Sequence, residues 1–308
     1  MVSIPVKTSP ALEDTFYYAA GIGFLALAKL KHLLNGYSTP KPIPNSDYGQ
    51  CVDYDITTVD HWLSHLAQYC PAQSSIKGKK ILELGPGADL GIALYLLALG
   101  AEQYNALDVH NLVERVSPQF YDQLFERLQR QDGLEFSSSE LREALEKATS
   151  RAGHRLNYVC REDFDIAASF EPGSLDLVFS QAAFEHFDDV DRMAQQLGEV
   201  VKPGGMLIAE VDLMTHSRWI REKDPNNIYR YNDGLYNLFY FKGIPNRVRP
   251  NFYRECLLKH GWKEVLLKPL ECLSEPQAGR LSQSWSPKFR GAEHQMECLT
   301  FMLCATKA

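Results

Sequence analysis

The sequence predicts an α/β fold with a doubly wound, mostly parallel sheet of seven strands. The first observation is that short apolar runs alternate with stretches of helical spacing from residue 80 to residue 306, as they do in α/β folds. The second is a glycine-rich turn at residues 85–91, between the first apolar run and the helix after it. Because ligands bind beside the carboxyl ends of the strands in such sheets, we expect a binding site next to this turn.

Each expected strand is a short apolar segment bounded by turn formers or by a helix. In chain order, strands are expected at 80–84, 103–109, within 156–164, and at 174–180, 204–213, 262–270 and 296–306. The helices between them are expected at 89–100, 119–130, 138–153, 190–203 and 251–261. Gly100 ends the first of these helices, and Pro203 with the two glycines after it ends the fourth.

Residues 1–75 are expected to form an N-terminal helical cap or lid, followed by a core at 76–308. Within the apolar segment at 15–34, the uncharged run 15–28 ends before Lys29 and is shorter than the about 20 residues that a membrane span takes, and the segment lacks the features of a signal peptide. A helix packed on the protein body is the preferred interpretation. A lid over an apolar substrate and shallow contact with a membrane surface are the less favoured alternatives. Residues 38–49, rich in proline, are expected to link this helix to the next.

The helix after the linker is expected over 57–69, because its apolar residues share one face. These residues are Val59, Trp62, Leu63, Leu66 and Tyr69.

Two insertions interrupt the pattern, at about 111–155 and 214–250. Insertions on such sheets commonly surround the edge where ligands bind. The second is rich in aromatic residues and arginines, and two interpretations stay open: a substrate cap that stacks a ring or a sugar, or a small core of its own with solvated arginines. The residues concerned are Trp219, Tyr229, Tyr231, Tyr236, Phe239, Tyr240, Phe241, Arg218, Arg221, Arg230, Arg247, Arg249 and Arg254.

Composition argues against several classes of protein. The net charge is −7 and no long basic run occurs, which disfavours a nucleic-acid partner. The seven cysteines include no C-x-x-C pair, so neither a zinc site nor a disulfide framework is predicted, and no metal site of another kind is expected. Free thiols suit a reducing compartment such as the cytoplasm. We expect a small-molecule partner, and the sequence is also compatible with a homodimer in which 1–75 is an arm.

The glycine turn departs from the dinucleotide fingerprint G-x-G-x-x-G. Gly85 and Gly87 fit, but the next glycine, Gly91, is one place late. Glu83 precedes the turn, where a carboxylate would repel a pyrophosphate and attract a cation. Asp108 ends the second expected strand, where an acid can accept the hydroxyls of a ribose. The pattern therefore predicts a nucleoside cofactor that lacks a pyrophosphate and carries positive charge.

In these motifs the chain resembles the class I S-adenosylmethionine-dependent methyltransferases, most closely the small-molecule branch with the type 11 methyltransferase domain. The resemblance covers residues 79–209 and is weaker over 250–268. The motifs that carry it are LELGPGADLG, ALDVH, REDF, SLDLVFSQAAFEHFDDV and VVKPGGMLIAE. It implies a Rossmann-like sheet, S-adenosyl-L-methionine as cofactor, and methyl transfer to an oxygen or nitrogen of a small molecule such as a specialised metabolite or a glycan precursor.

The resemblance also implies roles for ten residues around the cofactor. The methionine and ribose end would be lined by Glu83, Gly85, Pro86 and Gly87, the ribose and adenine bound by Asp108, Val109, Asp163 and Phe164, and the methionine faced by Ser180 and Gln181. Strand-end capping is the alternative for the last two. Because the chain before Asp163 is longer than is usual in the family, Glu162 or Asp165 could take its place. Asp89 has no assigned role.

His186, His216 and Glu185 are the candidate general bases, with a supporting role in cofactor or loop packing as the alternative. Tyr48 and Tyr54 are weaker candidates for closing over the cofactor. Two rival functions are an NAD(P)-dependent oxidoreductase and a non-catalytic binding protein. The late glycine and Glu83 argue against the first, and the paired acids before and after the turn argue against the second.

Overall fold

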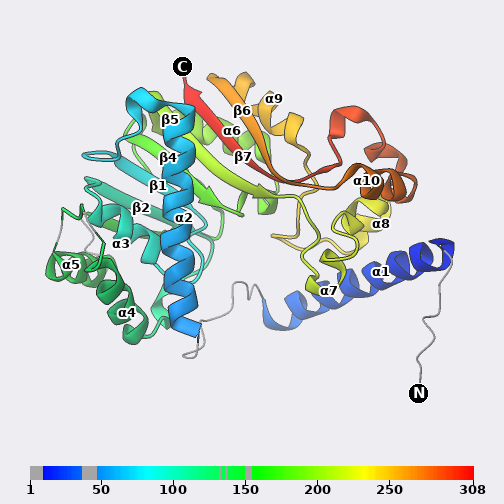
Figure 1. The fold of residues 1–308 in the computed structure, drawn as a ribbon, viewed down its shortest axis with the longest axis horizontal. Coiled ribbons are helices and arrows are strands. Elements are labelled where there is room, and N and C mark those ends of the chain that lie inside the picture. The colour runs from blue at the N-terminus through cyan, green and yellow to red at the C-terminus, as the bar shows by residue number, and fades with distance from the viewer. Residues whose placement is uncertain (1–9, 37–46, 132, 136, 150–154) are drawn as a thin grey trace.

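The protein is described by a computed structural model over residues 10–36, 47–131, 133–135, 137–149 and 155–308. Its centre is a seven-stranded sheet in the order β3-β2-β1-β4-β5-β7-β6 (Figure 1). β7 runs antiparallel to both of its neighbours, and the other pairs are parallel. The predicted mostly parallel seven-stranded sheet is therefore confirmed. The strands are β1 Lys80–Leu84, β2 Gln103–Asp108, β3 Leu156–Cys160, β4 Leu175–Gln181, β5 Val201–Asp212, β6 Trp262–Cys272 and β7 Cys298–Lys307.

The predicted helices lie close to their expected places. The helices of the structure are α1 Pro10–Asn35, α2 Tyr48–Tyr69, α3 Gly91–Ala98, α4 Pro118–Leu128, α5 Ser138–Thr149, α6 Val190–Val200, α7 Arg218–Arg221, α8 Asp233–Leu238, α9 Pro250–Lys259 and α10 Glu275–Leu281. Three of these, the short helices α7, α8 and α10, are additions that the sequence pattern did not predict. Short 3-10 turns lie at η2 Pro71–Gln73, η3 Val113–Arg115, η4 Phe184–His186, η5 Asn227–Arg230, η6 Ser282–Ser284, η7 Pro287–Phe289 and η8 Ala292–His294. Of the linker predicted at 38–49, residues 38–46 lie outside the described part of the chain, and α2 begins at Tyr48.

One prediction was wrong at the start of β5. The helix that should have ended at Pro203 ends at Val200, and the strand begins at Val201. The pairing of β4 with β5 shifts from Leu175↔Val201 to Leu177↔Met206, so Pro203 falls in an irregular stretch of the ladder. A proline can occupy a strand at such a position because no ladder hydrogen bond depends on its missing N–H.

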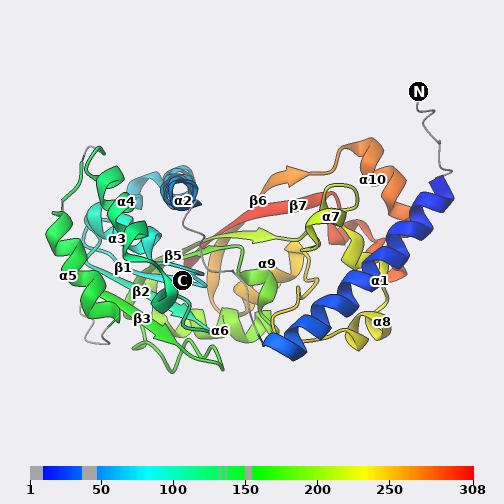
Figure 2. The ribbon, with the colours of Figure 1, turned by 90° about the horizontal axis from the view of Figure 1, so that it is seen from below.

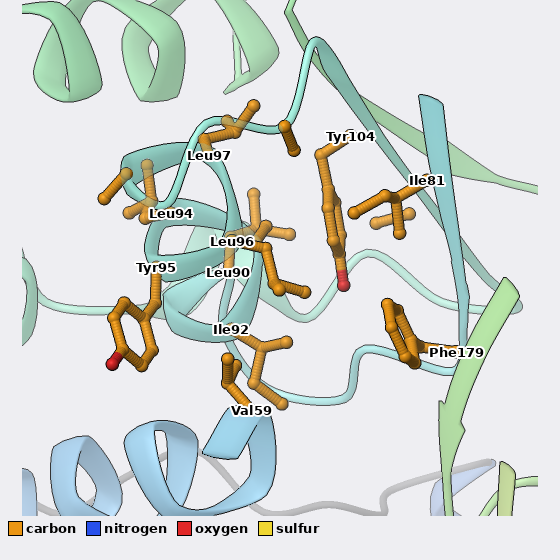
Figure 3. Packing of buried hydrophobic residues seen from close by; sticks show 14 of the residues in the cluster. Val59, Ile81, Leu90, Ile92, Leu94, Tyr95, Leu96, Leu97, Tyr104 and Phe179 are labelled. Carbon is orange, nitrogen blue, oxygen red and sulfur yellow. The ribbon is translucent and has the colours of Figure 1, made fainter. Parts of the chain in front are cut away.

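Alternating side chains of the strands divide the core between the two faces of the sheet. On one face, Ile81, Tyr104 and Phe179 pack with α2, α3, α4 and α5. Figure 3 shows α3 between the strand residues and Val59 of α2, which explains why all eight residues of this helix are buried. On the other face, the strands pack with α6 and α9. The site is thus carried by a rigid, close-packed layer structure.

A third apolar cluster lies beyond the carboxyl end of β5, within the second insertion and residues 273–299. α1 lies along this outer lobe rather than on the sheet (Figures 1 and 2). The Asn227 side chain donates to the carbonyl of Tyr17 at 3.0 Å, and Tyr231 donates to that of Tyr18 at 3.0 Å. None of the helices in the described ranges is long and apolar enough to cross a membrane.

The segment 1–75 therefore holds two helices in different surroundings. α1 packs on the outer lobe, whereas Val59, Trp62 and Leu66 of α2 are fully buried in the core of the sheet. The shared face predicted for 57–69 is confirmed. The boundary at residue 75 stays a prediction, and the packing of α2 argues for counting that helix with the core.

Candidate functional site

A cavity of about 1450 Å³ opens at the carboxyl ends of the central strands. Its wall combines the glycine turn, the segments after β2 and β4, the REDF loop and one face of α2. The lining residues from these segments include Glu83, Gly85, Pro86, Gly87, Asp89, Asp108, Val109, Asp163, Phe164, Gln181, His186 and, from α2, Gln50, Tyr54 and Asp55. Residues that are distant in the sequence thus meet at the edge where the strand pattern placed a site.

The glycine turn brings the backbone close to this cavity. Gly85 and Gly87 have φ values of 73° and 80°, a region that side chains disfavour and glycine adopts freely. A Cβ on Gly85 would also lie 2.7 Å from the Cβ of Ala183. The two glycines are therefore required by backbone geometry as well as by access to a ligand.

Asp108 is held rigidly at the cavity wall by backbone N–H groups. Its Oδ2 accepts from Gly87 at 3.3 Å, and its Oδ1 accepts from Val109 at 2.6 Å and from His110 at 3.2 Å. Burial raises the pKa of this carboxyl, and the backbone donors oppose that rise. Because a carboxylate has about four acceptor positions, Asp108 keeps capacity for the hydroxyls of a ligand.

Two buried acids, Glu83 and Asp55, and the half-buried Asp89 surround the turn. Glu83 accepts a hydrogen bond from Tyr104 at 2.8 Å, and burial raises its pKa to about 8, with Asp89 and Asp108 adding to the rise. Burial likewise raises the pKa of Asp89 to about 6 and that of Asp55 well above its ordinary value. Within the described part of the chain, no ion pair joins Glu83, Asp89 or Asp55 to a cationic side chain. Such a group of acids favours a cationic ligand.

Asp55 was missed by the sequence analysis, and it explains the late glycine. The carboxylate reaches the turn from α2, and a Cβ on Gly91 would lie 2.0 Å from its Oδ2. The N–H of Gly91 donates to Asp89 at 2.8 Å, so Asp89 binds the first turn of α3. The available signal was a charged residue one helical turn before Val59, where the apolar face of 57–69 continues toward the N-terminus of α2.

Gln181 and Ser180 occupy different places. The Oε1 of Gln181 accepts from the indole of Trp62 at 3.0 Å, and the amide lines the cavity. Ser180 is fully buried and donates to the carbonyl of Leu84 at 2.9 Å, and it is not among the lining residues. The alternative of strand-end capping, in place of contact with the cofactor, therefore applies to Ser180. Similarly, Tyr54 lines the cavity, whereas Tyr48 is buried in the core.

The REDF loop contributes one ring and two acids. Phe164 lines the cavity with φ at 48° and packs against Phe187, with ring centroids 5.1 Å apart. Asp163 also lines it, but its carboxylate accepts from Arg161 at 2.9 and 2.8 Å, which lowers its pKa to about 2. Glu162 lines the cavity too.

Asp165, the acid that follows the REDF motif, contacts α6 instead of the cavity. Asp165 accepts from Arg192 at 3.0 Å and from Gln196 at 2.9 Å, and it is not a lining residue. Its side chain holds the loop against α6, which makes it a poor substitute for Asp163 at the cofactor.

The three candidate bases lie together at one end of the cavity. His186 lines it, and its Nδ1 is 2.6 Å from the carbonyl of Gly243. The ring of His216 packs against that of His186 with centroids 4.8 Å apart. Burial lowers the pKa of both histidines and raises that of the buried Glu185 well above its ordinary value. The group is a side-chain cluster rather than a row of independent bases.

The second insertion forms a core of its own. Tyr229, Tyr231 and Tyr236 are buried in the outer lobe, and none of the aromatic residues singled out in the sequence lines the cavity. Arg230 and Arg247 are buried and paired with acids. The stacking cap is therefore wrong for the three tyrosines, which form a small core instead. Arg230 and Arg247 are buried, whereas the small-core interpretation expected solvated arginines. Lys242 and Gly243 are the insertion residues that line the cavity.

A comparison with protein families indicates a methyltransferase domain in part of the chain. The model of a methyltransferase domain family matches residues 119–209, which begin after the glycine turn. No curated protein matches the chain.

Three of the solved structures to which the chain is similar differ in identity, coverage and TM-score. Phosphoethanolamine N-methyltransferase 2 of Haemonchus contortus, in complex with S-adenosyl-L-methionine, is 17% identical over 80% of this chain and 52% of that one, with a TM-score of 0.43. The chain thus spans about half the length of that protein. The CurJ carbon methyltransferase is 15% identical over 100% and 72%, with a TM-score of 0.47. A methyltransferase of Mesorhizobium loti is 13% identical over 78% and 96%, with a TM-score of 0.40.

Proposed function

We propose that the chain is a class I S-adenosylmethionine-dependent methyltransferase that transfers the methyl group to an oxygen or nitrogen atom of a small molecule; the matched methyltransferase domain and the strand order support the proposal. The observation that carries it is the group of acids formed by the buried Glu83 and Asp55 and the half-buried Asp89, which line the cavity without a cationic partner in the described chain. S-adenosylmethionine carries both a sulfonium and an ammonium group. Its methionine end would supply the missing positive charge.

The other parts of the cofactor would lie along the cavity wall beside these acids. The ribose hydroxyls would bind Asp108, whose carboxylate is fixed by three backbone N–H groups. The adenine would lie between Val109 and Phe164, with Asp163 or Glu162 accepting from its exocyclic amine. Gln181, oriented by Trp62, would meet the methionine portion. Ser180 has no part in this arrangement because its hydroxyl is buried and bonded to Leu84.

The cavity has room for a second ligand. Its volume of about 1450 Å³ exceeds the roughly 300–1,000 Å³ of an ordinary small-molecule pocket. The end walled by His186 and Lys242 is therefore assigned to the acceptor. Specialised metabolites and glycan precursors are the classes that we favour.

Methyl transfer needs alignment more than acid–base chemistry. Bond formation to the methyl carbon proceeds as the bond to sulfur breaks, and the sulfonium becomes a neutral thioether. Holding the acceptor in line with that bond supplies much of the rate. A hydroxyl acceptor must also lose a proton. With its Nδ1–H donated to Gly243, the neutral His186 ring presents Nε2 as the basic nitrogen toward the acceptor end.

The test is a pair of binding and turnover measurements. Calorimetry should give one site for S-adenosylhomocysteine, and incubation with S-adenosylmethionine and a panel of hydroxyl and amine compounds should release S-adenosylhomocysteine. Quenching of the protein fluorescence by NADH, without binding of S-adenosylhomocysteine, would instead establish the oxidoreductase. Absence of both kinds of binding at millimolar concentration would establish the non-catalytic alternative.

A further inference from the structure

We propose that Glu185, His186 and His216 hold one divalent transition-metal ion at the acceptor end of the cavity, and that this ion binds the acceptor through oxygen. One ligand atom from each of the three side chains lies within 4.8 Å of the others. Binding of the ion stands on these side chains alone. Its contact with the acceptor rests on the proposed function.

The topology of the sheet brings the three residues together. Glu185 and His186 belong to η4, which follows β4, and His216 follows β5. These two strands are parallel neighbours and end side by side, with Gln181 opposite Glu210. The segments after them therefore leave the same edge of the sheet, and side chains 30 positions apart in the sequence can share one ion.

Glu185 is the strongest single indication. Its side chain is buried, and neither carboxylate oxygen has a hydrogen-bond partner of ordinary geometry in the described structure, although the backbone N–H groups of Glu185 and Asp212 lie near it. Buried polar groups almost always have partners, and an exception calls for a physical reason. The nearby guanidinium of Arg221 does not supply one, because it donates to Asp212 at 2.5 Å. A metal ion would satisfy the charge and the lone pairs of Glu185 together.

The histidines are oriented in a way that suits metal binding. The Nδ1 of His186 is 2.6 Å from the carbonyl of Gly243, so the Nδ1–H donates there and Nε2 keeps its lone pair. Metal-binding histidines usually donate their second N–H to a carbonyl or carboxylate in this manner. Asp212 lies 3.8 Å from the Nε2 of His216 and is fixed by Arg221 and by the N–H of Met214 at 2.9 Å. Because Arg221 pairs with this carboxylate, the charges of Asp212 and Arg221 largely offset each other beside the ion.

The ligand set indicates the kind of metal. Two imidazoles and one carboxylate suit Zn²⁺, Fe²⁺, Co²⁺, Ni²⁺ or Mn²⁺ better than Ca²⁺ or Mg²⁺, which prefer oxygen alone. With bonds of about 2.0–2.2 Å to the ion, ligand atoms lie roughly 3–4 Å apart. From a separation of up to 4.8 Å, the ligand atoms therefore need to approach one another by about 1–2 Å. Three protein ligands leave coordination positions open, and His186 places the ion at the cavity wall.

These open positions define the class of acceptor. A hydroxyl with a second oxygen beside it could bind the ion through both atoms. Coordination lowers the pKa of the bound hydroxyl, and because the Nε2 of His186 then binds the ion instead of acting as the base, the proton leaves to water and an alkoxide or phenolate remains. That oxygen forms a bond to the methyl carbon while the bond between methyl carbon and sulfur breaks. The products are the methyl ether and neutral S-adenosylhomocysteine, and no oxidant or reductant is required.

The experiment uses Co²⁺ as the probe, because its visible absorption bands report the ligands directly. The full-length protein is freed of metal with a chelator and titrated with Co²⁺. We expect bands that saturate at one equivalent and disappear when Zn²⁺ displaces the cobalt. His216→Ala and Glu185→Gln should each weaken binding at least tenfold. His294→Ala is the matched control, since His294 also lies beside a glutamate, with its Nε2 3.6 Å from Glu293, and should bind Co²⁺ as the wild type does.

The outcomes separate this proposal from the proposed function. Far-ultraviolet circular dichroism identifies any variant that fails to fold, and Glu185→Gln, which keeps the shape of the side chain, stands in for His216→Ala in that case. Binding of S-adenosylhomocysteine without Co²⁺ bands at millimolar Co²⁺ overturns the metal site and leaves the methyltransferase intact. Co²⁺ binding that survives unchanged in both variants also overturns it. Co²⁺ bands in a protein that binds no S-adenosylhomocysteine support the metal site and reject the proposed function.

Discussion

Gly91 and Asp55 meet so closely that a Cβ on residue 91 would lie 2.0 Å from the carboxylate Oδ2 of Asp55. The glycine opens α3, and the acid comes from the middle of α2. The position of this glycine, one place later than in a dinucleotide fold, therefore makes room for an acid at the cavity.

Gly91→Ala should destabilise the protein by about 1–3 kcal/mol, as overpacking of a buried site does. Urea unfolding measures the change. Gly279→Ala is the control, because nothing lies within 4 Å of a Cβ there; alanine in that helix should be neutral or slightly stabilising. In the Asp55→Ala background the penalty of Gly91→Ala should shrink, since the two residues are in contact. An equal penalty in both backgrounds would refute the close approach.

Binding of S-adenosylmethionine should release a proton near pH 7. The pKa of Glu83 is raised to about 8, so the ligand-free carboxyl is mostly protonated there, and a cationic ligand favours the charged form. Affinity should therefore rise as the pH increases from about 6 to 8. Calorimetry in buffers of different ionisation enthalpy counts the protons. Glu83→Gln should abolish the release, whereas the exposed Glu102→Gln should not. A pH-independent affinity in the wild type would contradict the prediction.

The same shift has a consequence for stability. Since the folded-state pKa of Glu83 lies above its ordinary value of 4.5, the unfolded state binds fewer protons between pH 4.5 and about 8. The ligand-free protein should therefore lose stability as the pH rises through that window. Denaturant midpoints at several pH values test this, and Glu83→Gln should flatten the curve.

Trp62→Phe should weaken cofactor binding through Gln181. The stacking of Trp62 on Phe179, with ring centroids 4.9 Å apart, can be kept by phenylalanine, but the amide oxygen of Gln181 loses its donor. An unsatisfied acceptor costs about 1–3 kcal/mol. Calorimetry with S-adenosylhomocysteine should show roughly that loss. Trp219→Phe changes an exposed tryptophan that packs against Phe16 of α1 and should leave the affinity unchanged, and equal effects of the two substitutions would contradict the role of Trp62.

Arg230→Met should destabilise the outer lobe and release α1. Arg230 pairs with the buried Asp224 at 2.6 Å and with Asp14 of α1. Removing one partner of a buried ion pair costs about 3–5 kcal/mol. Urea unfolding and limited proteolysis of α1 measure the two effects. Arg142→Met breaks an exposed pair with Asp122 and should cost under about 1 kcal/mol; a similarly small effect of Arg230→Met would show that the pair does not secure the helix.

The fold followed from the sequence because its signals are local. Strands such as 80–84 are apolar runs, and the turn after them has glycines that the backbone itself requires. The start of β5 was misjudged because Pro203 ends most secondary structure, and only the pairing with β4 shows that the strand tolerates it. The place of α1 depends on contacts with residues near 230, about 200 positions away, which no local pattern contains.

The site was predictable where strand ends dictate it. Glu83, Asp108, Gln181 and His186 all reach the cavity. Ser180 does not, because successive side chains of a strand point to opposite faces and Gln181 holds the position toward the cavity.

Other parts of the site depend on tertiary contacts. Asp55 comes from a helix packed on the sheet, so its approach to Gly91 is visible only in three dimensions. The spacing of cysteine pairs gives no information about the cluster of Glu185, His186 and His216. Its residues follow two separate strands and meet only in the folded chain.

The central claim is that this cavity binds S-adenosylmethionine with its ribose on Asp108. Calorimetric titration of S-adenosylhomocysteine into the wild type, Asp108→Ala and the exposed-acid control Asp122→Ala tests it most directly. We predict micromolar binding to the wild type and the control, and at least a tenfold loss, about 1.4 kcal/mol, in Asp108→Ala. Unchanged affinity in Asp108→Ala would contradict the assignment of the site.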